Sequence, residues 1–329
     1  MKKIVSVVAF CLLFVMSICR ANDILVEKYL NRYYMLSKEL KTIDNVEVQV
    51  YGSCHAYSSF NSKLFTDLYG VYSYNMANPS ETIPASYLRM YERFKKDKPK
   101  VALVEIWGIN AYDTYISKEE ILDTYLRTNI ENIPFSMEKM EVIKDFEALD
   151  AIEDNIAFVK YKDRVIDFAL NEVDFDYSFE RANAYYNPKA DKSSYNEMKT
   201  RLENNGFWAC PTDNMYDYAE YIPEVGAHEK LEVEADLLKY IDKIIQLCEE
   251  QDVKLIFYRA PYRSNANELK KVNWLADYLS EKNVAFYDLE PVIEWDYTVD
   301  FYDYEHLSET GAKKATLYLG EIINKELVK

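Results

Sequence analysis

Three short polar blocks, far apart in the chain, carry the side chains that acyl transfer requires: Gly52-Ser53-Cys54-His55, Gly108-Ile109-Asn110 and Asp303-Tyr304-Glu305-His306. A hydroxyl or thiol can attack an acyl carbon, an imidazole can move the proton, and a carboxylate can hold that imidazole in the correct tautomer. An amide N–H can stabilise the oxyanion that forms. The residue types therefore predict a centre for nucleophilic acyl transfer.

The first and last blocks supply the nucleophile and the proton carrier. Cys54 is the expected nucleophile, and Ser53 is the alternative. His306 is the expected acid and base. Asp303 stands three residues before His306, so its carboxylate can reach Nδ1 of the imidazole within one turn of the chain. We expect Cys54, His306 and Asp303 to act together.

The middle block supplies an oxyanion donor. Asn110 follows the strand that ends near residue 106, and we expect its amide to act with main-chain N–H groups near Cys54 and Ser80. Two neighbours receive structural roles instead: His55 is expected to point into the fold, and Glu105 to be a buried partner at the strand end. His228, Cys210 and Cys248 are also expected to be structural.

Alternating apolar runs and helical stretches must position these blocks. Strands are predicted at 46–51, 99–106, 253–258 and 284–289, with a shorter run at 72–76. Helices are predicted at 80–96, 229–251, 266–282 and 309–325. This alternation predicts an α/β fold with a parallel sheet covered on both faces. Ligands of such sheets bind beyond the carboxyl ends of the strands, which is where the three blocks stand.

The stretch of about 112–232 interrupts the alternation. It is acidic and aromatic, and its pattern is mostly helical or irregular. We interpret it as an inserted, mainly helical cap over the strand ends rather than as an independent domain.

The blocks resemble those of the SGNH (GDSL-like) hydrolases, which have a Gly-Asp-Ser block after the first strand, a Gly-x-Asn-Asp block after the third and an Asp-x-x-His block near the C-terminus. The cell-surface branch is most similar, including proteins associated with membrane-bound O-acyltransferases and with D-alanylation of teichoic acid. Its Gly-Ser-Ser-His form of the first block corresponds here to Gly52-Ser53-Cys54-His55. The similarity spans roughly 24–325. It implies a flavodoxin-like three-layer sandwich with the catalytic roles assigned above.

Two departures from that family affect the expected function. Cys54 stands where the family has its catalytic serine, and Ser80 is the nearest counterpart of the glycine in the second block. Cys54 could be a working thiolate, or it could mark a member that has lost turnover and keeps ligand binding. A shifted register that makes Ser53 the nucleophile is the third possibility.

The resemblance implies an extracytoplasmic esterase or acyltransferase acting on acyl esters of a cell-surface polysaccharide or envelope polymer. It implies no cofactor or metal, and a membrane-bound O-acyltransferase as a possible partner. The alternative is a catalytically impaired module that binds an acylated glycan or a partner in a polymer-modification complex.

Charge and composition set further limits. The 329 residues include 56 acidic and 39 basic side chains, and the formal net charge is −17. Such a chain is repelled by nucleic acid and by anionic membrane surfaces. The three histidines are scattered and no metal-binding spacing is present, so no metal site is expected.

The N-terminus has the pattern of an export signal. Lys2 and Lys3 precede a largely apolar run over 4–19, with small residues before Asn22. We expect 1–21 to be a signal peptide or an N-terminal membrane anchor, and 22–329 to be the SGNH hydrolase-like domain outside the cytoplasm. Three cysteines remain beyond this segment, an odd number with no pairing pattern.

Overall fold

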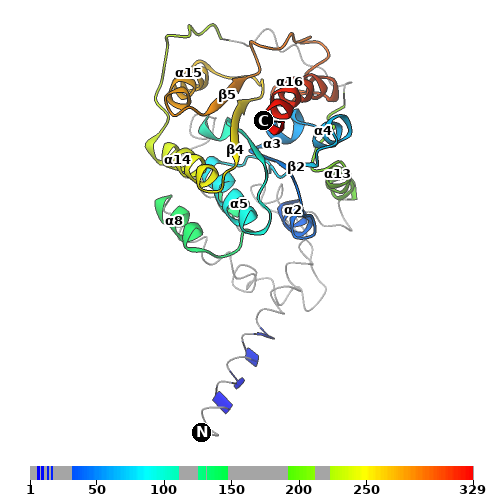
Figure 1. The fold of residues 1–329 in the computed structure, drawn as a ribbon, viewed down its shortest axis with the longest axis vertical. Coiled ribbons are helices and arrows are strands. Elements are labelled where there is room, and N and C mark those ends of the chain that lie inside the picture. Colours follow the sequence, from blue (N-terminus) through cyan, green and yellow to red (C-terminus); the bar gives the residue numbers. More distant parts are fainter. Residues whose placement is uncertain are drawn as a thin grey trace.

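The computed structural model describes residues 32–110, 125–130, 132–146, 192–211 and 223–328, together with a few positions between 6 and 17. Within them the chain forms an α/β fold: one five-stranded, all-parallel sheet flanked by helices (Figure 1). The predicted fold class is confirmed at this level. Because each parallel connection needs a crossover, the helices come to lie on the two faces of the sheet.

The strands are β1 (Val48–Tyr51), β2 (Ser73–Asn75), β3 (Val101–Glu105), β4 (Lys254–Arg259) and β5 (Ala285–Asp288). Their order in the sheet is β2-β1-β3-β4-β5, which is the order of flavodoxin-like sheets. From β1 the chain adds β2 on one side, and it then adds β3, β4 and β5 on the other side. The switch point therefore lies between β1 and β3, and ligands of such folds bind there. All five predicted strands are present, each within three residues of its expected bounds.

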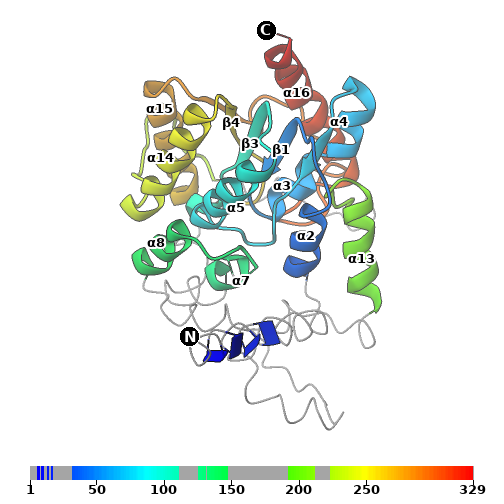
Figure 2. The same ribbon diagram turned by 60° about the horizontal axis from the view of Figure 1, so that its bottom comes forward.

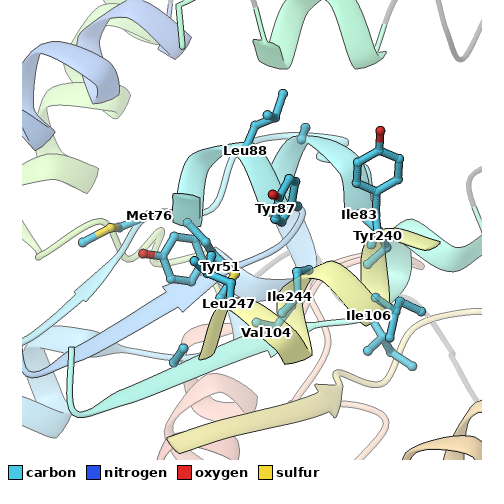
Figure 3. Packing of buried hydrophobic residues seen from close by; sticks show 14 of the residues in the cluster. Tyr51, Met76, Ile83, Tyr87, Leu88, Val104, Ile106, Tyr240, Ile244 and Leu247 are labelled. Carbon is cyan, nitrogen blue, oxygen red and sulfur yellow. The ribbon is translucent and has the colours of Figure 1, made fainter. Parts of the chain in front are cut away.

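Side chains alternate between two cores along the buried strands. In β3, Ala102 and Val104 face one core, and Val101 and Leu103 face the other. The first core lies under α5 (Ile83–Lys96), α14 (Ala235–Glu250) and α15 (Ala266–Glu281), and Figure 3 shows part of its packing. The second lies under α3 (Cys54–Ser59), α4 (Ser62–Tyr69) and α16 (Glu309–Leu327). Burial on both faces explains why β3 is apolar throughout.

Capping residues explain where several helices begin. Asn265 and Glu268 form a capping box at the start of α15, and Ser308 accepts a hydrogen bond from the main chain of Gly311 at the start of α16. Two predicted helices begin later than expected. The helix predicted at 80–96 begins at Ile83 with a proline in its first turn, and the one predicted at 229–251 begins at Ala235.

The described part of the predicted cap contains helices joined by irregular segments. Its helices are α7 (Arg127–Ile130), α8 (Met137–Asp145) and α13 (Lys192–Glu203). Figure 2 shows α7 and α8 beside α5, and α13 beside α2 (Arg32–Leu40), in agreement with their contacts. Most of 112–232 lies outside the described residues, so a cap over the strand ends stays a prediction.

Arg201 links α13 to the chain that follows β2 by hydrogen bonds. Its guanidinium donates to the carbonyl oxygens of Gly206 (2.8 Å) and Ala77 (2.5 Å) and lies 4.0 Å from the ring centre of Tyr57. Gly206 has φ +79°, and a side chain there would collide with the carbonyl of Asn75 at the end of β2. The chain therefore returns to the edge of the sheet at this point.

The predicted signal segment and its cleavage region lie largely outside the described residues. Among the residues that are described, no helix combines the length and hydropathy needed to cross a bilayer.

Candidate active site

The first polar block forms a tight turn between β1 and α3. Gly52 has φ +128°, and a Cβ at this position would lie 2.8 Å from Cβ of Glu105 on β3, so only glycine fits without strain. Ser53 caps α3 by accepting a hydrogen bond from the main-chain N–H of His55 (3.2 Å). Cys54 is the first residue of the helix and is partly exposed. The turn thus presents the thiol beyond the end of β1.

Ser53 is buried, and its hydroxyl is hydrogen-bonded to neighbouring side chains. Its side chain has no exposed surface, and its hydroxyl donates to Oε2 of Glu105 (2.9 Å) and contacts Nδ1 of His55 (2.9 Å). A nucleophile must reach the acyl carbon of a bound substrate. The geometry therefore favours Cys54 over Ser53 for that role. Glu105 is fully buried and also accepts from the main chain of Trp107 (2.9 Å), as expected of a buried partner.

Asp303 and His306 form the expected carboxylate–imidazole couple. Nδ1 of His306 lies 2.9 and 3.0 Å from the two carboxylate oxygens of Asp303. The main-chain N–H groups of Glu305 and His306 donate to Oδ1 of Asp303, each at 2.8 Å. An antiparallel bridge between Phe301 and Leu307 closes this turn. Because a carboxylate only accepts, Nδ1 of His306 carries a hydrogen and Nε2 points away from Asp303.

The ring of His306 is packed between two other rings. It stacks on His55 with centroids 5.6 Å apart and meets Trp208 edge-on at 5.4 Å. Its Nε2 atom is buried and makes no close hydrogen bond within the described residues, and besides Asp303 the side chain of Cys54 acts on this ring. A buried polar atom without a close partner is costly in a native fold, and a catalytic role is one physical explanation for it.

Charge couples Cys54 to this histidine. Burial raises the pKa of the Cys54 thiol, but the positive charges of His55 and His306 outweigh it and hold the pKa well below its ordinary value. Burial lowers the pKa of His306, while the Cys54 thiolate and Asp303 raise it to about 9. Both shifts favour a thiolate beside an imidazolium, which is the state in which a cysteine is nucleophilic.

We expect a bell-shaped pH dependence for any ester turnover at this centre. Activity should rise as Cys54 ionises, well below the ordinary thiol pKa, because the thiolate fraction grows with pH. It should fall as pH passes about 9, because His306 then loses the proton it donates. Measuring kcat/KM for an aryl ester across this range checks both limbs. A rise centred at the ordinary thiol pKa of about 8.5 would contradict the ion pair.

His55 takes a larger part in the site than its residue type suggested. It is 2% exposed, as expected of a buried histidine. However, Nδ1 of His55 lies 3.9 Å from Sγ of Cys54, and Nε2 lies 3.1 Å from Oε2 of Glu305. The only sequence signal for this role is that His55 directly follows the nucleophile position.

Asn110 joins the site through a tyrosine. It ends the short 3₁₀ helix η1 (Trp107–Asn110), is fully buried, and donates from Nδ2 to the hydroxyl of Tyr262 (2.6 Å). The ring centre of Tyr262 lies 4.5 Å from that of His55. Tyr262 was not predicted, because it follows β4 in a segment without a polar block. Asn110 therefore meets the Cys54 turn by way of Tyr262.

Ser80 lies in the segment between β2 and α5. It has φ +51°, a left-handed backbone that glycine adopts more readily, and its carbonyl accepts from Asn129 of α7 (3.3 Å). Nearby, a Cβ on Gly108 would lie 2.8 Å from the main-chain nitrogen of Ile83. The main chain of Asn78 donates to the carbonyl of Gly52 (3.1 Å). The segment of Ser80 thus adjoins both the first and the middle block.

No family model and no curated protein matches the chain. The SGNH resemblance therefore depends on the residues quoted for it.

The cysteines of the described chain, Cys54, Cys210 and Cys248, are all free. Cys210 is buried close to the site, and burial, with the charges of Asp303 and Cys54, raises its pKa. Cys54 is therefore the thiol with nucleophilic character. In the same part of the chain, no group of three or more histidine, cysteine or acidic side chains is arranged to hold a metal ion.

Proposed function

We propose that this chain is an extracytoplasmic SGNH-type esterase or acyltransferase that acts on acyl esters of a cell-surface polysaccharide or envelope polymer. The observation that carries the proposal is the grouping of Cys54, His306 and Asp303 at the carboxyl edge of a flavodoxin-ordered parallel sheet. Asp303 binds one nitrogen of His306, and the other nitrogen is buried, makes no close hydrogen bond within the described part of the chain, and has Cys54 as its charged neighbour.

The first chemical step forms an acyl-enzyme. The thiolate of Cys54 attacks the acyl carbon, a C–S bond forms, and the carbonyl electrons move to oxygen. Asn110 stabilises this oxyanion together with main-chain N–H groups near Cys54 and Ser80. The C–O bond to the polymer then breaks, and the imidazolium of His306 gives its proton to the departing alkoxide oxygen. Asp303 keeps the ring in the tautomer that leaves Nε2 toward the reaction.

The second step removes the acyl group. Water or a sugar hydroxyl gives its proton to Nε2 of His306 and attacks the thioester carbon. The C–S bond breaks, which restores the thiolate of Cys54 and the imidazolium. Hydrolysis and transfer differ only in this acceptor. An O-acyltransferase in the membrane is the partner that the family resemblance suggests as the acyl donor or recipient.

An assay of the purified full chain tests the proposal. It should hydrolyse a short-chain aryl ester, release acyl groups from an acetylated polysaccharide, and yield a mass increment on Cys54 when the reaction is quenched early. The competing function is an inert SGNH-like module that binds acylated glycan. If the chain is such a binding module, it should show neither turnover nor an acyl adduct. It should still bind the acetylated polysaccharide, and this binding should be lost after base treatment has removed the ester groups.

The oxyanion role of Asn110 gives a separate prediction. Asn110→Ala should lower kcat by about 10²–10³-fold, since that is the typical effect of losing one side-chain oxyanion donor. Tyr262→Phe removes the acceptor that orients the amide and leaves the amide itself, so its effect on kcat should be smaller. Equal losses in both variants, accompanied by lower thermal stability, would indicate that Asn110 supports the fold rather than the oxyanion.

A further inference from the structure

A chain of hydrogen bonds runs through the buried ring of His55 from one carboxylate to another. Ser53 donates to Oε2 of Glu105 (2.9 Å), and the same Ser53 oxygen lies 2.9 Å from Nδ1 of His55. On the other side of the ring, Nε2 of His55 lies 3.1 Å from Oε2 of Glu305. Ser53, Glu105 and His55 are almost entirely inaccessible to solvent.

Counting hydrogens along this chain gives the charge of His55. A serine hydroxyl has a single hydrogen, and Ser53 donates it to Glu105. Burial raises the pKa of Glu105, whereas the charge of His55 and the hydrogen bonds from Ser53 and Trp107 favour its ionised form. With Glu105 ionised, the Ser53 oxygen accepts from Nδ1 of His55, which then carries a hydrogen. Glu305 can only accept while it is ionised, so Nε2 of His55 carries a hydrogen as well. An imidazole with a hydrogen on both nitrogens is a cation.

This cation is placed against the nucleophile, with Nδ1 of His55 3.9 Å from Sγ of Cys54. We propose that His55 is a permanently charged positioning residue which, separately from His306, holds Cys54 as a thiolate. The inference rests on the proposed function for its consequence, faster attack on acyl groups, although the charge itself is measurable without any substrate.

The other charged and titratable groups around His55 come from three segments: Glu105 on β3, Tyr262 after β4, and Glu305 and His306 in the C-terminal turn. Burial lowers the pKa of His55, but the charges and hydrogen bonds of Cys54, Glu305 and Glu105 raise it well above its ordinary value. The side chain of Glu305 is 47% exposed, and its partial burial raises its pKa, but the hydrogen bond and charge of His55 bring that pKa below the ordinary value. The surroundings thus favour the cation.

A second cation has a distinct use in the second chemical step. The thiolate of Cys54 is then the leaving group, while His306 is occupied with the proton of the acceptor. A charge that stays on His55 stabilises the departing thiolate throughout. This arrangement also assigns a role to each residue of the Gly52-Ser53-Cys54-His55 block.

Alkylation of Cys54 by iodoacetamide, followed by peptide mass spectrometry of the full chain, measures the thiolate directly. In wild-type protein the alkylation rate should rise with pH well below about 8.5. His55→Gln keeps a polar side chain but cannot carry a charge, so it should raise the apparent pKa of Cys54 by about 1–3 units. His306→Ala should still leave that pKa below the ordinary thiol value. His228→Gln, a histidine exposed in a loop, is the matched control and should leave the profile unchanged.

Superposable alkylation profiles for wild type and His55→Gln would overturn the proposal. If His55→Gln does not fold, nitrogen-15 NMR of histidine-labelled wild-type protein decides the question. The chain has only three histidines, so His228→Gln and His306→Ala suffice to assign them. Near neutral pH the two ring nitrogens of His55 should show the shifts of an imidazolium, and the shifts of a neutral ring would overturn the proposal.

These measurements separate this inference from the proposed function. A low thiol pKa that depends on His55, in a protein that turns over no ester, would support the charge and refute the enzyme. Normal turnover with a thiol pKa indifferent to His55→Gln would do the reverse.

Discussion

Cys54→Ala is expected to reduce ester turnover by on the order of 10⁴-fold or more, because it removes the atom that carries the acyl group. The acyl adduct seen by mass spectrometry should disappear with it. Cys54 is partly exposed at the first residue of α3, so a smaller side chain there should have little effect on folding. The measurement is kcat/KM for an aryl ester, with the melting temperature of each variant recorded alongside.

Cys248→Ala is the matched control for this experiment. Cys248 is a free, buried cysteine of α14 that packs in the first core. Its loss should lower stability slightly and leave kcat/KM unchanged. Cys54→Ser is informative in a different way, since a gain of activity would show that the scaffold suits serine and that the thiol limits the wild-type protein. Turnover that survives Cys54→Ala and is lost in Ser53→Ala would reverse the assignment of the nucleophile.

His306→Ala should lower kcat by about 10²–10⁴-fold, the usual contribution of a positioned acid and base. The physical reason is that, without the imidazole, no side chain gives a proton to the leaving alkoxide, and none takes a proton from the attacking water or sugar hydroxyl. Asp303→Asn should act in the same direction. An amide beside Nδ1 can support the wrong tautomer, and the substitution removes the carboxylate whose hydrogen bond raises the pKa of His306. Single-turnover kinetics of acylation and deacylation measure the two steps separately.

Both steps should be slowed by His306→Ala, because the same imidazole serves as acid in one and as base in the other. The double variant Cys54→Ala with His306→Ala should be little worse than Cys54→Ala alone, since residues that act as a unit are not additive. Full independence of the two effects would contradict a shared mechanism. Equal activity of His306→Ala and wild type would end the enzyme proposal and favour the binding module.

The strands were predictable because their signal is local. A continuous apolar run such as that of β3 is what burial on both faces demands, and the turn residues after β1 and β3 mark the strand ends. The starts of α5 and α14 were predicted too early. In the structure Thr82 is the N-cap of α5, and a proline stands in the first turn, a position that suits its fixed backbone angle.

Pairing within the last block was also predictable. Asp303 and His306 are three residues apart, so one closed turn suffices to bring carboxylate and imidazole together. By contrast, the contact of His55 with Glu305 joins residues 250 positions apart, and that of Asn110 with Tyr262 joins residues 152 apart. The neighbouring residue types do not predict either contact.

Taken by itself, the amino-acid sequence determined the alternation of strands and helices, the parallel sheet and the local Asp303–His306 couple, because each depends on neighbouring residues and their periodicity. Only the tertiary structure decided that Ser53 is buried while Cys54 is partly exposed, and that His55 is held between two carboxylates. The physical reason is that burial and charge depend on every group packed nearby. A histidine becomes a lasting cation when the fold surrounds it with acceptors, and that surrounding comes from segments that meet only in the folded chain.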